Sequence, residues 1–307
     1  DRKVMSENNK NFSLTESVSS VTIELLHDKL NSLPKNSDLH KEFLAYLSRD
    51  FATSAINGIS EYLVIVQNLL KEVNTQTEHN GRLAQHIWTI EKMLGRNTEY
   101  YSQAGQDRFI EKEFFSRKTG GVFVDIGGYD GLTSSNTLYF ERFLGWRGLC
   151  IEPVPKFYEL MSDIRNAVCL NVALADYNGE GSFLEINKGL SQMGGLMATL
   201  RKGLPEFVKD KGSETRQINV PVKTFQSIVS DQDLTHIDYC SIDVEGAEIS
   251  VLKGIDFNKS DISVFSIENP TSFGNNQSIV RDYMENEGYQ LVRSIGDDIF
   301  AKATLLG

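Results

Sequence analysis

The 307-residue sequence contains only three cysteines, and no two of them are spaced as a CxxC pair. Cys150, Cys169 and Cys240 each lie in an apolar, strand-like run, so we predict reduced core thiols rather than a zinc or redox site. No apolar run approaches the roughly 18 residues of a membrane span. The first residues, DRKVMSENNK, lack the apolar core of a signal peptide. These absences predict a cytoplasmic protein without a membrane span.

Positive charge is also scarce, because 31 Lys and Arg residues face 42 Asp and Glu residues, a formal net charge of −11. The deficit is uneven: the balance is −1 in residues 1–98 and −10 in residues 99–307. A protein that binds nucleic acid needs cations that displace counterions from the phosphates. We therefore expect no nucleic-acid partner.

Residues 1–98 have the apolar spacing of amphipathic helices. The stripes are Phe43, Leu47 and Phe51, then Ile59, Leu63, Val66, Leu70 and Val73, and then Leu83, Ile87, Ile90 and Leu94. A small helical bundle or hairpin would bury these stripes internally. A module for homo-oligomerisation or partner docking would bury them against another chain, and the pattern favours neither alternative.

From residue 99 onward, short apolar runs alternate with helical segments. This alternation predicts a parallel sheet with helices on both faces. The stretch 289–304 should form a hairpin that leaves one strand antiparallel. The glycine-rich stretch 187–215 has little strand character, and we expect it to pass over the sheet as a substrate lid. The expected strands are 122–127, 148–153, 167–174, 218–224, 236–243 and 262–268, and the expected helices are 134–145, 156–166, 246–254 and 278–288.

The loop DIGGYDG (125–131) follows the first expected strand, and ligands of open α/β sheets bind beyond the carboxyl ends of strands. A dinucleotide fingerprint needs G-x-G-x-x-G around a pyrophosphate, and this loop has no G-x-G. Asp125 and Asp130 would repel a pyrophosphate. They would attract a ligand with an ammonium and a sulfonium, such as S-adenosylmethionine, although Asp130 also fits as a helix cap. Glu152, 21 residues after Gly131, stands where an acid typically binds ribose hydroxyls.

Six motifs lie between about residue 100 and residue 303: YSQAGQD (101–107), FVDIGGYDG (123–131), CIEPVP (150–155), NVALADYNGEGSF (171–183), YCSIDVEGAEISVLKG (239–254) and GYQLVRSIGDDIF (288–300). On these motifs, the sequence resembles the FkbM-type family of S-adenosylmethionine-dependent methyltransferases. The resemblance implies an α/β, Rossmann-like class I methyltransferase fold, with seven strands and an antiparallel last strand, in a domain at 99–307. It also implies O-methylation of a hydroxyl on a small-molecule or glycan acceptor, commonly a sugar or a natural product.

The same resemblance assigns cofactor contacts. The glycines of the first motif let the backbone approach the methionine moiety, and its acid binds the ammonium, directly or through water. Asp176 falls where such folds contact adenine, but it also fits as a plain turn acid. The YSQAGQD motif also fits as a helix cap. The implied cofactor residues are Gln103, Asp107, Asp125, Gly127, Gly131, Glu152 and Asp176.

Acidic residues cluster where the expected strand 236–243 ends. Asp243, Glu245 and Glu248 lie within six residues, at the start of the expected helix 246–254. Three acids are more than favourable interaction with the helix dipole would explain. Methyl transfer to a hydroxyl needs a base, and the single histidine of this region, His236, opens a strand remote from the expected cleft. The candidate bases are therefore Asp243, Glu245 and Glu268.

A bound divalent cation such as Mg²⁺ would assist by lowering the pKa of the acceptor hydroxyl. Asp243, Glu268 and Asn269 offer the oxygen ligands that such a cation prefers. Full activity after exhaustive chelation would contradict this hypothesis.

Two other functions compete with methyl transfer. One is a methyltransferase-like binding module with a vestigial cofactor site, against which the intact Asp125, Gly127, Gly131 and Glu152 argue. The other is a nicotinamide-dependent oxidoreductase, against which the missing G-x-G argues. If the cofactor site is intact, we expect Asp125→Ala or Glu152→Ala to abolish cofactor binding without unfolding the protein.

Overall fold

The structure is a computed structural model, and it describes residues 87–92, 94–268 and 277–306. The chain divides into two compact units, Asp1–Ile65 and Val66–Gly307, and all described residues belong to the second. Most of the predicted helical region at 1–98 lies outside the described residues. Its role in oligomerisation or docking stays a prediction.

The central feature is a seven-stranded sheet with the strand order β10–β11–β9–β8–β1–β2–β3. All neighbouring strands are parallel except at β11, which runs antiparallel to both β9 and β10. This arrangement confirms the predicted class I sheet with its antiparallel last strand. The strands are β1 (Val122–Ile126), β2 (Arg147–Ile151), β3 (Val168–Leu170), β8 (His236–Ile242), β9 (Asp261–Glu268), β10 (Tyr289–Ile295) and β11 (Asp297–Lys302).

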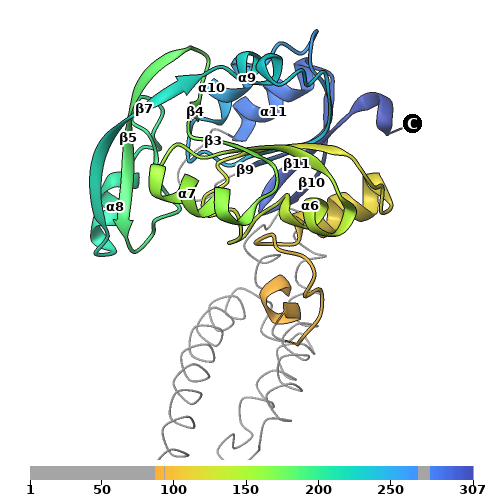
Figure 1. The fold of residues 1–307 in the computed structure, drawn as a ribbon, viewed down its shortest axis with the longest axis horizontal. Coiled ribbons are helices and arrows are strands. Elements are labelled where there is room, and N and C mark those ends of the chain that lie inside the picture. The colour runs from red at the N-terminus through yellow and green to blue at the C-terminus, as the bar shows by residue number, and fades with distance from the viewer. Residues whose placement is uncertain (1–86, 93, 269–276, 307) are drawn as a thin grey trace, which may run out of the picture. The chain divides into compact units, whose positions relative to one another are not determined.

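Helices cover both faces of this sheet (Figure 1). Neighbouring residues of a strand point to opposite faces, so Val124 and Phe123 of β1 belong to separate hydrophobic clusters. The first cluster packs against α9 (Phe225–Asp231), α10 (Glu248–Lys253) and α11 (Gln277–Asn286), and the second packs against α5 (Gln106–Ile110), α6 (Leu138–Leu144) and α7 (Pro155–Ile164).

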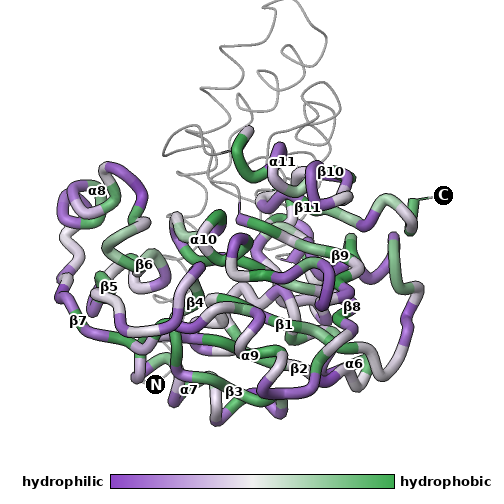
Figure 2. The backbone as a smooth tube through the Cα atoms, turned by 90° about the horizontal axis from the view of Figure 1, so that it is seen from above, coloured by the Kyte–Doolittle hydropathy of each residue, from purple (hydrophilic) through white to green (hydrophobic). Residues whose placement is uncertain are grey.

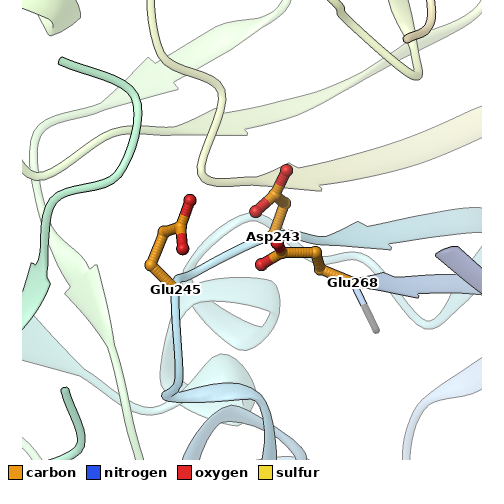
Figure 3. Close-up of side chains that lie close together, drawn as sticks. All are labelled: Asp243, Glu245 and Glu268. Atoms are coloured by element: carbon orange, nitrogen blue, oxygen red, sulfur yellow. The ribbon is translucent and has the colours of Figure 1, made fainter. Parts of the chain in front are cut away.

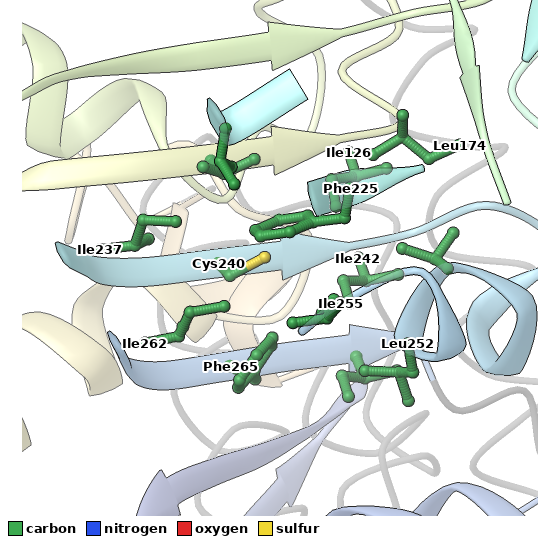
Figure 4. Close-up of a cluster of buried hydrophobic side chains, with 14 of the residues drawn as sticks. Ile126, Leu174, Phe225, Ile237, Cys240, Ile242, Leu252, Ile255, Ile262 and Phe265 are labelled. Carbon is green, nitrogen blue, oxygen red and sulfur yellow. The ribbon is translucent and has the colours of Figure 1, made fainter. Parts of the chain in front are cut away.

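Hydrophobic and hydrophilic residues alternate along the central strands β8 and β9, whereas β1 is mostly hydrophobic (Figure 2). Figure 4 shows Cys240 of β8 beside Phe225 in the first cluster, with Phe265 on the neighbouring strand β9. Cys150 and Cys240 are buried and Cys169 is half-buried, and all three are free thiols. Consecutive residues of β1, β8 and β9 are buried, so these strands are covered on both faces.

A second sheet has four strands in the order β4–β7–β5–β6, and it corrects two expectations. The expected strand 167–174 is two short strands in different sheets, and the stretch 187–215 is not a bare excursion. Strand β5 begins with four polar or glycine residues that are exposed or half-buried, which is why it lacked an apolar signature. The elements are β4 (Ala173–Leu174), β5 (Gly179–Lys188), β6 (Gly195–Leu196), α8 (Leu204–Asp210) and β7 (Glu214–Lys223).

The expected helix at 134–145 is also shorter, because α6 begins only at Leu138. Asp130 does not cap this helix. Its carboxylate accepts hydrogen bonds from the backbone N–H groups of Leu132 and Thr133, at 3.0 and 2.7 Å. Asp130 therefore stabilises a turn between the glycine loop and α6.

The folded unit extends upstream of residue 99. Residues 87–92 are helical, and the indole N–H of Trp88 donates to the carbonyl oxygen of Ser102 at 2.8 Å. The Trp88 ring lies so close to Gly105 that a Cβ there would be 2.9 Å from it. Within the described residues, no helix is long and apolar enough to cross a membrane, and the cytoplasmic location stays a prediction.

Candidate active site

The glycine loop begins where β1 ends. Gly127 has φ of +89°, and its N–H donates to the carbonyl oxygen of Ile151 at 2.9 Å. A Cβ at Gly127 would lie 1.8 Å from the carbonyl oxygen of Asp243. Only glycine fits this approach, which brings the carboxyl ends of β1, β2 and β8 together. Gly131 has φ of +78° and lies against Met161.

Glu152 directly follows β2, and only 6% of its surface is exposed. Its carboxylate accepts hydrogen bonds from the backbone N–H groups of Tyr129 and Val154, at 3.0 and 2.8 Å. Burial raises the pKa of Glu152 to about 8, against the opposing effect of these two bonds. Glu152 is thus a buried carboxyl group held in one orientation beside the glycine loop.

A pocket opens over these carboxyl ends. Gly127, Glu152 and Asp243 line it from the main sheet, and Ala173 lines it from the second sheet. The stretch 187–196 covers another side through Ser191, Gln192, Gly194 and Leu196. The expected lid therefore lies at the pocket, as a connection between strands of the second sheet.

Asp125 does not line this pocket. Its carboxylate accepts a hydrogen bond from the Thr137 hydroxyl at 2.5 Å and lies 3.5 Å from a guanidinium nitrogen of Arg165. Arg165 also bonds to Glu141 at 2.9 Å and to the Ser135 hydroxyl at 3.2 Å. Burial raises the pKa of Asp125, and the Arg165 charge opposes that effect. The described contacts of Asp125 brace the loop between β1 and α6.

Four other predicted cofactor residues also lie outside the pocket wall, and Gly131, described above, is one of them. Asp107 is fully buried, and its carboxylate accepts hydrogen bonds from the backbone N–H groups of Tyr101 and Ser102, at 2.6 and 3.1 Å. Gln103 is exposed in the same turn. Asp176 is exposed and accepts a hydrogen bond from the Ser250 hydroxyl at 2.8 Å. Their cofactor contacts stay predictions.

The three candidate bases come together at one edge of the sheet. One carboxylate oxygen from each of Asp243, Glu245 and Glu268 lies within 4.8 Å of the other two, and their side chains point toward one another (Figure 3). Glu245 is buried and has φ of +57°, which turns its side chain back toward the cluster. Asn269, the other proposed cation ligand, lies outside the described residues.

Asp243 is open to the pocket, although protein atoms pack around its carboxylate. This enclosure, together with the charges of Glu268 and Glu245, raises its pKa well above the ordinary value. The combination describes a carboxylate that is accessible to a ligand and binds a proton more strongly than an ordinary aspartate does.

Arg201 is the residue of this site that the sequence did not reveal. It lies between β6 and α8, and its guanidinium donates to Glu245 at 2.6 Å, to Glu248 at 3.1 Å and to Glu268 at 3.1 Å. Burial lowers its pKa, but these carboxylates outweigh that effect and raise it. A single arginine in a glycine-rich stretch belongs to no recognisable sequence motif. Only the fold brings it next to acids that lie more than forty residues away in the sequence.

A comparison with known families matches residues 125–291 to the methyltransferase FkbM domain, which is more than half of the chain. The chain belongs to the FkbM methyltransferase family. Methyltransferase sdnD of Sordaria araneosa is 30% identical over 190 residues, which cover 48% of this chain and 69% of sdnD. The predicted family is therefore confirmed.

Solved structures of methyltransferases are more distant from this FkbM family member. Methyltransferase FkbM from Methylobacillus flagellatus has a TM-score of 0.41 and 14% identity, covering 77% of this chain but only 59% of that chain. A TehB-like SAM-dependent methyltransferase from Corynebacterium glutamicum has a TM-score of 0.37 and 11% identity, covering 70% and 94%. We therefore assign the class I fold from the strand order of the seven-stranded sheet in this chain.

The pocket of this FkbM methyltransferase fits S-adenosylmethionine, the methyl donor of such enzymes. Glu152 presents a carboxylate whose remaining lone pairs suit two neighbouring hydroxyl donors, as a ribose offers. Gly127 brings bare backbone to the pocket wall, and Asp243 adds oxygen acceptors that suit an ammonium group. The loop has no phosphate-binding G-x-G, which favours this donor over a dinucleotide.

Proposed function

We propose that this protein is an O-methyltransferase that acts on a hydroxyl of a sugar, glycan or glycosylated natural product. The observation that supports the proposal most is Asp243, an accessible carboxylate with a raised pKa beside the cofactor pocket. S-Adenosylmethionine would supply the methyl group when bound. We assign the methyltransferase domain to residues 99–307, with upstream support from Trp88.

Each residue has a separate task in this proposal. Glu152 and Gly127 hold the cofactor, through its ribose hydroxyls and by close backbone approach. Asp243 accepts the proton that the acceptor hydroxyl loses as its oxygen becomes methylated. A base is most effective when its pKa approaches the working pH, and the raised pKa of Asp243 serves that purpose.

Arg201 and its glutamates shape the charge around the base. The guanidinium binds Glu245, Glu248 and Glu268 and partly offsets their negative charge. The carboxylates accept hydrogen bonds and cannot donate them when ionised, so the site suits an acceptor rich in hydroxyl donors. We therefore propose an uncharged polyhydroxylated acceptor in preference to a phosphorylated one.

A cation-assisted reaction is the second candidate. The close oxygen atoms of Asp243, Glu245 and Glu268 are the observation that favours a divalent cation such as Mg²⁺. Arg201 competes with that cation, because it already donates to two of the three carboxylates. Exhaustive chelation separates the alternatives: the Asp243-base reaction keeps full activity, whereas the cation-assisted reaction loses it and regains it when Mg²⁺ is returned.

A labelled-methyl assay tests the proposal. The protein is incubated with methyl-labelled S-adenosylmethionine and neutral oligosaccharides or glycosylated natural products, and sugar nucleotides serve as the phosphorylated comparison. We expect label in an acid-stable methyl ether, and a loss of about 10²- to 10⁴-fold in kcat for Asp243→Asn, as for removal of a general base. Label on nitrogen, or an unimpaired Asp243→Asn variant, would contradict it.

A further inference from the structure

Tyr129 is a bulky residue in a backbone conformation that usually belongs to glycine. It lies between Gly128 and Asp130 with φ of +49°, a region that costs energy for a side chain with a Cβ. Its N–H donates to Glu152 at 3.0 Å. The ribose-binding carboxylate therefore helps to hold Tyr129 in this conformation, and the orientation of its side chain depends on it.

That orientation places the Tyr129 ring in the pocket wall. The ring centroid lies 4.3 Å from that of Phe157 on α7, and both side chains line the pocket. The phenolic oxygen lies 2.7 Å from the hydroxyl oxygen of Ser191, 62 residues along the chain. One side chain thus joins the cofactor loop to the connection between β5 and β6.

The connection that contains Ser191 is anchored at both ends. At one end, the N–H of Leu190 donates to the Ser213 hydroxyl at 3.3 Å. At the other end, Leu196 pairs with Phe183 across β6 and β5. Ser191 and Gln192 lie between these anchors and line the pocket. The bond to Tyr129 therefore connects the glycine loop of the main sheet with the connection between β5 and β6 of the second sheet.

We propose that Tyr129 is a cofactor-positioning residue whose hydroxyl, bonded to Ser191, holds residues 189–194 across the pocket and slows the release of the bound cofactor. The inference rests on the proposed function insofar as this pocket holds the adenosyl group. It adds a residue that controls how fast the cofactor binds and leaves. It holds whichever acceptor the enzyme uses.

Stopped-flow measurement of S-adenosylhomocysteine dissociation tests the inference in the full chain without an acceptor. We expect Tyr129→Phe and Ser191→Ala each to raise the dissociation rate about 2- to 10-fold, the range for one net hydrogen bond. The double variant should be no faster than either single variant, because both substitutions remove the same bond. Tyr177→Phe and Ser182→Ala, which alter exposed side chains of the second sheet region, are the controls.

Unchanged dissociation in both single variants, or additive effects in the double variant, would overturn the inference and leave the proposed function intact. A wild-type protein that does not bind S-adenosylhomocysteine would overturn both. Ser191→Ala keeps the test decisive if Tyr129→Phe fails to fold.

Discussion

At the residue scale, the acids of this site differ in what they contact. Glu152 and Asp243 line the pocket, whereas Asp125 is braced by Arg165 and Thr137. Motif spacing places an acid at the end of a strand, but it does not say to which face of the sheet the side chain points. That direction depends on the alternation along β1, which turns Asp125 toward α6.

Asp125→Ala should destabilise the protein as well as affect the cofactor. The substitution leaves the fully buried Arg165 side chain without one of its two carboxylates, and breaking a buried ion pair costs about 3–5 kcal/mol. This expectation replaces the one drawn from the motif alone. Denaturant unfolding measures it, with Asp163→Ala, at an exposed position of α7, as a control that should stay within about 0.5 kcal/mol. Equal stability of the two variants would contradict the bracing role.

Glu152 should make stability and binding depend on pH in opposite directions. Its pKa is about 8 in the folded protein, against an ordinary value of 4.5. Between these values the folded state holds a proton that the unfolded state has lost, so the contribution of Glu152 to stability falls as pH rises. Ribose hydroxyls favour the ionised carboxylate, so affinity for S-adenosylhomocysteine should rise with pH over the same window.

Chemical unfolding and calorimetric titration between pH 5 and 8.5 check both slopes, with Glu152→Gln as the comparison. The stability of wild type relative to Glu152→Gln should decrease with pH, and the affinity of Glu152→Gln should lose its slope. Parallel pH curves for the two proteins would assign the titration to another group.

At the element scale, the site depends on one close approach between β1 and β8. Gly127 lies where any side chain would collide with the backbone of Asp243. The sequence predicted a ligand loop here, and in the structure Gly127 and Glu152 line the pocket. The sequence missed β5 and β6, because β5 begins with polar and glycine residues and β6 consists of only Gly195 and Leu196.

Gly127→Ala should damage the site more than a positive φ alone explains. Gly145 is a matched control, since its φ is +62° and a Cβ there meets no atom within 4 Å. Gly145→Ala should lose about 1–3 kcal/mol from backbone strain. Gly127→Ala should lose more, and it should also bind S-adenosylhomocysteine more weakly. Thermal unfolding and calorimetry compare the pair, and equal losses would rule out the collision.

At the scale of the whole molecule, the methyltransferase unit uses residues upstream of the family match. Trp88 is 5% exposed and packs in the second hydrophobic cluster with Tyr100 and Ile110. The family match begins only at residue 125. The first residue of the match is therefore not the first residue of the hydrophobic core.

Trp88→Ala in the full chain should therefore lower stability by about 3–5 kcal/mol, the usual cost of truncating a buried large aromatic residue. Denaturant unfolding measures this loss. A loss below about 1 kcal/mol would show that the core is complete without residues 87–92, and it would favour a domain that begins at 99.

The sequence by itself determined the alternation of strands and helices, the antiparallel last strand, the family and the acids of two motifs. These features are local patterns, set by strand periodicity, glycine conformation and the order of elements along the chain. Only the tertiary structure decided that Arg201 binds three glutamates, that Arg165 braces Asp125, and that Tyr129 meets Ser191. Each of these contacts joins segments that no short-range pattern relates, because the packing of helices and loops around the sheets brings them together.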